Sequence, residues 1–75
     1  MPYNSLTPRA RELLVILTEH GEWMTRKELA SALGKPQLAA HDITQLEVLE
    51  AKGRIEVRSS RAYRKPVLWE YKAKP

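Results

Sequence analysis

Apolar residues recur at helical spacing in the first third of the chain. The stripe that they form consists of Ala10, Leu13, Leu14 and Leu17. Val15 points away from this stripe. Thr7 is a favourable N-cap, Pro8 suits the first helical position, and Gly21 suits a C-cap. These signals predict a helix over residues 8–20.

Two further helices follow a short extended segment at residues 22–25. Thr25 and Glu28 have the spacing of a capping box, and Gly34 stops the pattern, which predicts a helix over 26–33. A third helix is predicted over 36–52, ending at Gly53. Its expected buried stripe is Ala39, Ile43, Leu46 and Leu49. Its expected exposed positions include His41, Thr44, Gln45, Val48 and Lys52.

After Gly53 the hydrophobic period changes from helical to alternating. Ile55 and Val57 indicate one half-buried strand, and Val67, Trp69 and Tyr71 indicate a second. Together they predict a hairpin over about 54–73 with a long polar connection. The sequence therefore predicts a single α+β domain over residues 1–75, with Trp23, Trp69 and Tyr71 in its core or on a sheet face.

Charge is distributed unevenly along the 75 residues, whose formal net charge is +4. Residues 1–50 hold five basic and seven acidic residues, whereas residues 51–75 hold eight basic and two acidic ones. Such clustering favours a surface that faces a polyanion. The absence of cysteine excludes disulfides and Cys-based zinc sites. No apolar run approaches the ~20 residues that a bilayer requires, and no secretory leader is visible, so a cytoplasmic location is expected.

Two passages carry a resemblance to a known family. Residues 26–34 read RKELASALG, and residues 49–57 read LEAKGRIEV. The first is similar to the second helix of the winged helix-turn-helix family, in its small bacterial or archaeal form with a MarR- or ArsR-like core. The second resembles that family's passage from recognition helix into wing. The resemblance covers about residues 8–72 and implies a winged-helix fold whose third helix enters the DNA major groove. It also implies that the short strand after helix one pairs with the wing.

Three groups of residues are candidates for nucleic-acid contacts. Carried over by position, the resemblance implies that Gln37, His41, Thr44 and Gln45 reach base edges. Candidates to clamp phosphates beside the helix-turn-helix are Arg26, Lys27 and Lys35. Candidates in the wing are Arg58, Arg61, Tyr63, Arg64 and Lys65. The third helix holds three acids, Asp42, Glu47 and Glu50, against the single base Lys52, a net charge of −2. We therefore expect the basic wing to be the main contact, and Asp42 is the acid hardest to reconcile with DNA binding.

The expected function is double-stranded DNA binding, in transcriptional regulation or a related DNA transaction. A protein-interaction module, and single-strand or RNA binding through the basic wing, remain alternatives. His20 and His41 lack the spacing of metal ligands, so no bound metal is expected. The sequence shows no set of catalytic residues and no phosphate-binding loop, so no cofactor and no enzymatic activity are expected. Val15 and Ile16 form a small apolar spot that a second copy could cover, and a monomer or weak homodimer is expected.

Overall fold

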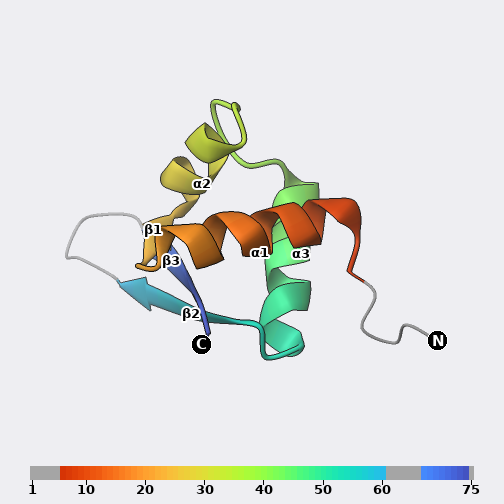
Figure 1. Ribbon diagram of the computed structural model, residues 1–75. Helices are drawn as coiled ribbons and strands as arrows, with labels where there is room; N and C mark the ends of the chain where they lie inside the picture. The colour runs from red at the N-terminus through yellow and green to blue at the C-terminus, as the bar shows by residue number, and fades with distance from the viewer. Residues whose placement is uncertain (1–5, 61–66, 75) are drawn as a thin grey trace.

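The computed structural model describes residues 6–60 and 67–74, and within them three α-helices and a three-stranded antiparallel sheet make up the fold (Figure 1). In chain order the elements are α1 (Pro8–His20), β1 (Met24–Thr25), α2 (Arg26–Ala32), α3 (Ala40–Ala51), β2 (Ile55–Ser60) and β3 (Leu68–Ala73). The predicted α+β class is confirmed.

The ends of α1 and the start of α2 are set by the caps that the sequence predicts. The Thr7 hydroxyl accepts a hydrogen bond from the backbone N–H of Ala10 at 3.1 Å. Gly21 takes the left-handed conformation, with φ of 75°, and its N–H donates to the Leu17 carbonyl at 3.1 Å. At the start of α2, Thr25 and Glu28 form a reciprocal capping box with distances of 3.1 and 2.8 Å. The predicted boundaries of α1 and the first residue of α2 are therefore confirmed.

The start of α3 differs from the prediction by one helical turn. The helix begins at Ala40 and not at Pro36, and residues 33–39 form the connection from α2. Gly34 has a φ of 77° and turns the chain away from α2. Ala39 is the extended N-cap residue, and its backbone N–H donates to the carboxylate of Asp42 at 2.9 Å. A side chain inside the helix therefore caps α3 where residue 39 has none to offer.

The sheet has the strand order β1-β3-β2, so β3 is the central strand. Tyr71 of β3 lies opposite Met24 on one side and Val57 on the other. The short segment after α1 thus pairs with the hairpin, as expected. Tyr71 is 3% exposed and joins the sheet to the helical core.

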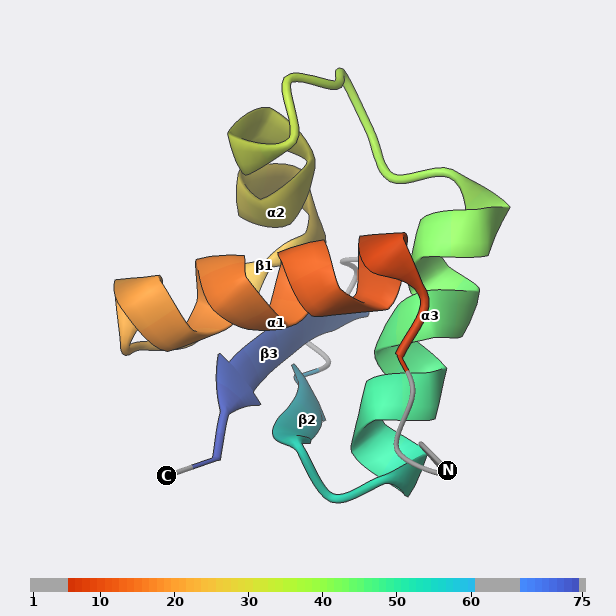
Figure 2. The same ribbon diagram turned by 45° about the vertical axis from the view of Figure 1, so that its right-hand side comes forward.

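The core lies where α1, α2, α3 and the sheet meet. In Figures 1 and 2, α2 and the hairpin lie on opposite sides of α1, and α1 crosses α3. The largest fully buried apolar side chains are Leu13, Leu17, Leu29, Leu46, Leu49 and Ile55. Their packing supplies the apolar burial that stabilises so short a chain. Within residues 6–60 and 67–74, no helix combines the length and the apolar character that crossing a bilayer requires.

The buried face of α3 is rotated from the predicted one. Leu46 and Leu49 are buried as predicted, but Ile43 is only half-buried and Ala39 is exposed. Two polar residues, Asp42 and Gln45, complete the buried face. Their spacing with Leu46 and Leu49 is i, i+3, i+4 and i+7, which is that of a helix packed along one side.

Candidate nucleic-acid interface

Asp42 holds together the N-terminal ends of α1 and α3 and the connection between α2 and α3. Its Oδ2 accepts from Lys35 Nζ at 2.6 Å and from the Ala39 N–H at 2.9 Å. Its Oδ1 lies 3.5 Å from Arg9 Nη1. Burial acts to raise the pKa of Asp42, but the hydrogen bonds and positive charges around the carboxylate outweigh it and hold the pKa below its ordinary value. Asp42 is therefore a buried anion, and two cations compensate its charge.

This arrangement corrects the expected role of two sequence candidates. Asp42 was expected to face DNA and repel it, but it is 1% exposed. Lys35 was expected to contact phosphate, yet its ammonium group is bound to Asp42. Arg9, which no sequence motif singled out, supplies the second positive charge. An acid at the third position of a helix is a recognised capping signal, and that signal would have placed Asp42 correctly.

Gln45, which was expected on the exposed surface of α3, is also buried. Its Oε1 accepts a hydrogen bond from the Thr7 hydroxyl at 2.6 Å, and the residue is 8% exposed. The same hydroxyl caps α1, so Gln45 links α3 to the N-cap of α1. The prediction that Gln45 is exposed is wrong, as is that for Val48, which is half-buried.

Gln45→Ala is expected to lower the free energy of unfolding by about 1–2 kcal/mol, because it removes a buried hydrogen bond and leaves a gap. Thr44→Ala is the matched control, since Thr44 is exposed and its hydroxyl donates only to the Ala40 carbonyl of its own helix. Urea unfolding followed by circular dichroism measures both. Equal stability of the two variants would contradict the structural role of Gln45.

The exposed surface at the N-terminal end of α3 retains three of the candidates. His41 and Thr44 lie exposed on α3, and Gln37 is exposed on the connection that precedes it. Gln37 also lines a cleft of about 260 Å³ between α2 and the start of α3, together with Arg26 and Lys27. The structure thus brings amide and basic side chains together on this surface. The acid at the start of α3, Asp42, is paired with Lys35 and Arg9.

Arg26 and Arg58 each lie over a tryptophan ring. The Arg26 guanidinium is 5.1 Å from the centre of the Trp69 ring, and its Nε donates to the Tyr71 hydroxyl at 2.9 Å. The Arg58 guanidinium is 4.0 Å from the Trp23 ring centre, and its Nε donates to Glu70 at 2.8 Å. Both arginines are thus held by the protein itself, which reduces the charge that either offers to a phosphate.

The two faces of the sheet separate these arginines. Arg58 and Glu70 are register partners, as are Ser59 and Trp69 one residue along. Because neighbours in a strand point to opposite faces, Arg58 lies on the face opposite to that of Trp69. Trp69 shares its face with the buried Tyr71, two residues along. Arg58 therefore lies on the outer face of the sheet, away from the core.

A second cleft, of about 190 Å³, lies between α3 and the sheet. It is lined by Arg26, Glu47, Glu50, Val57, Trp69 and Tyr71. Glu47 and Glu50 are exposed, and neither is paired with a basic residue in the part of the chain that the structure describes. Its two carboxylates outnumber the single positive charge of Arg26, so this cleft is net acidic and partly aromatic. The charged residues that line the cleft between α2 and α3 are Arg26 and Lys27, both basic.

The wing candidates Arg61, Tyr63, Arg64 and Lys65 lie outside the described residues. Among the residues that the structure does describe, no three histidine, aspartate or glutamate side chains converge as a metal site would require. A scan of the chain against models of protein families finds no family that matches, and a search of curated proteins finds no similar sequence.

Proposed function

We propose that the chain is a winged helix-turn-helix domain that binds double-stranded DNA, in transcriptional regulation or a related DNA transaction. The observation that carries the proposal is the compensation of Asp42 by Lys35 and Arg9. It leaves the exposed N-terminal end of α3 without an uncompensated acid. The α2–α3 unit and the hairpin that follows agree with this architecture.

The proposed contacts divide into base and phosphate contacts. The Gln37 amide matches the donor and acceptor edge of adenine in the major groove. Thr44 already donates its hydroxyl proton to Ala40, so it offers its methyl group to thymine or its oxygen as an acceptor. Lys27, exposed beside the cleft between α2 and α3, offers its charge to the phosphate backbone.

Fluorescence anisotropy of a labelled random duplex of about 20 base pairs, at roughly 50 and 200 mM salt, tests this proposal. Affinity is expected to fall steeply with salt. Lys27→Ala is expected to reduce the logarithmic salt slope by about one. Lys74→Ala is the matched control, because Lys74 directly follows β3 and lines a different cleft, beside Leu14 and Arg54. Absence of binding at the lower salt by folded protein would overturn the proposal, and preference for unpaired strands would favour the single-strand or RNA alternative.

A second candidate function is favoured by the acidic cleft between α3 and the sheet. Glu47 and Glu50 lie in the space where a DNA backbone would approach both α3 and the hairpin, and there they would repel phosphate. The same carboxylates, beside Trp69, would attract a basic segment of a partner protein. The two functions therefore make opposite predictions for these two residues.

Glu47→Gln combined with Glu50→Gln is expected to raise duplex affinity about three- to tenfold at low salt, because it removes two negative charges beside the bound backbone. Glu22→Gln combined with Glu56→Gln makes the same charge change at exposed positions elsewhere and controls for net charge. Titrations of a duplex and of an arginine-rich peptide distinguish the functions. Lost peptide binding without a gain in duplex affinity would favour the protein-interaction module.

A further inference from the structure

The outer face of α1 carries a charge pattern centred on an apolar residue. Arg11, Val15 and Glu19 follow one another at i, i+4 and i+8, and all three are exposed. Val15 is 49% exposed and points directly away from the core stripe of the same helix. The pattern is therefore basic towards the start of the helix, apolar in the middle and acidic towards its end.

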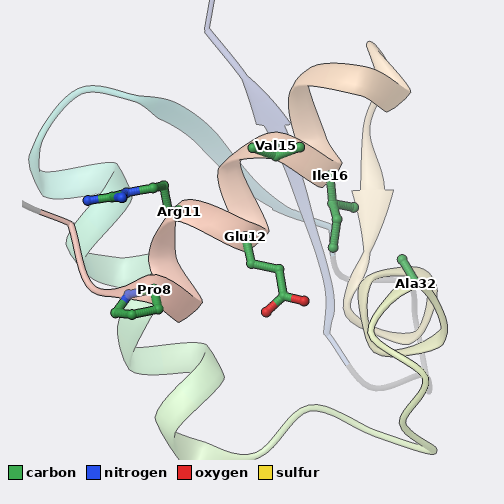
Figure 3. A pocket seen from close by; sticks show the side chains of 6 residues that line it. All are labelled: Pro8, Arg11, Glu12, Val15, Ile16 and Ala32. Atoms are coloured by element: carbon green, nitrogen blue, oxygen red, sulfur yellow. The ribbon is translucent and has the colours of Figure 1, made fainter.

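A groove of about 550 Å³ runs beside this stripe, between α1 and α2. Its lining residues are Pro8, Arg11, Glu12, Val15, Ile16 and Ala32. Figure 3 shows Glu12 and Ile16 extending on the side of α1 that faces α2, whereas Arg11 extends the other way. Oε1 of Glu12 lies 3.6 Å from Nε of Arg9 on the same helix, so the negative charge of Glu12 is already partly compensated. Apolar surface from Val15, Ile16 and Ala32 thus lies open beside charges of both signs.

We propose that this face of α1 binds a second copy of this chain, with the two α1 helices antiparallel about a two-fold axis at Val15. In that arrangement Arg11 of each copy lies level with Glu19 of the other, so two ion pairs flank a central Val15–Val15 contact. A parallel arrangement would instead place like charges together. Charge complementarity therefore selects both the occupant of this face and its orientation.

The size of the surface sets the strength of the association. The 13 residues of α1 span about 20 Å, and a single pair of helices buries less than the ~1,200 Å² of a stable interface. The dimer is thus weak in solution. Gln37, His41 and Thr44 do not line the groove, so the surface proposed for DNA lies outside it.

Sedimentation equilibrium between about 20 µM and 1 mM protein tests the proposal. The wild-type chain is expected to self-associate in the upper part of this range. Arg11→Glu makes the stripe wholly acidic and Glu19→Arg makes it wholly basic, and each is expected to weaken association about tenfold or more. An equimolar mixture of the two variants is expected to associate again, as a heterodimer. The chain that carries both substitutions is expected to associate again as a homodimer.

Arg54→Glu is the matched control, since it makes the same charge change at an exposed position outside the groove. Circular dichroism confirms that each variant is folded. A wild-type chain that stays monomeric throughout the range would overturn the proposal, and so would a mixture that associates no better than its components. Because no DNA is present, these outcomes do not depend on the proposed function.

Discussion

Asp42→Ala is expected to lower the free energy of unfolding by about 2–4 kcal/mol. Removing one member of a buried ion pair typically costs about 3–5 kcal/mol of stability, because the remaining charge stays buried in the low-dielectric interior without a partner. The side chains of Arg9 and Lys35 are 32% and 31% exposed, so they regain some hydration and the effect falls below that range. Domains of this length are stable by only about 4–11 kcal/mol, so the loss is a large fraction.

Urea unfolding followed by circular dichroism measures this loss. Glu47→Ala is the matched control, because it removes an exposed acid from the same helix. Its effect is expected to stay within about 0.5 kcal/mol. Equal effects of the two substitutions would show that the contacts of Asp42 contribute no more than an ordinary surface charge.

The pH dependence of stability follows from the same carboxylate. The folded-state pKa of Asp42 lies below its unfolded value, so the unfolded chain binds more protons and stability rises with pH. The contribution of Asp42 to the free energy of unfolding is complete above the unfolded-state pKa of about 4. It is lost as the pH falls through the lower folded-state pKa. The stability difference between wild type and Asp42→Asn is therefore expected to shrink on acidification below about pH 4. A constant difference down to pH 2 would contradict this assignment.

Arg61→Ala combined with Arg64→Ala is expected to weaken duplex binding on the order of tens of fold at about 0.1 M salt. The last 25 residues carry eight basic side chains and two acidic ones, and these two arginines lie in the predicted wing connection. Each lost phosphate contact removes about one released counterion, so the logarithmic salt slope is expected to fall by about two. Anisotropy across a salt series measures both quantities.

The control for the wing is Lys72→Ala combined with Lys74→Ala, which removes two positive charges from the end of β3. It is expected to leave the salt slope nearly unchanged. A slope that also stays unchanged in the arginine variant would show that the wing makes no phosphate contact. The DNA surface would then be confined to the α2–α3 side of the domain.

Local capping signals predicted much of the fold. Thr7, Gly21 and the pair Thr25 and Glu28 act within a few residues of themselves, so the sequence alone was enough to place the helix ends that they control. The start of α3 was mispredicted because Ala39 offers no capping side chain. That turn depends on Asp42, whose place as the third residue of the helix is a capping signal that the prediction did not use.

The candidate site was harder to predict, for a related reason. Hydrophobic periodicity assumes that buried residues are apolar, but half of the buried face of α3 is polar. Arg9 pairs with Asp42 across 33 residues of sequence, and Thr7 bonds to Gln45 across 38. No short window of sequence reveals these two tertiary pairings, whereas Lys35 lies only seven residues before Asp42. The exposed positions His41 and Thr44 were predicted correctly because they lie outside that face.

The central position of β3 has a consequence for the order in which the sheet forms. β1 and β2 do not pair with each other, and both find their strand partner in residues 68–73. The paired residues of β2 and β3 are 8 to 18 positions apart in sequence, whereas those of β1 and β3 are 45 to 47 positions apart. Because the entropic cost of closing a loop grows with its length, the β2–β3 hairpin is expected to form first and β1 to join the sheet last.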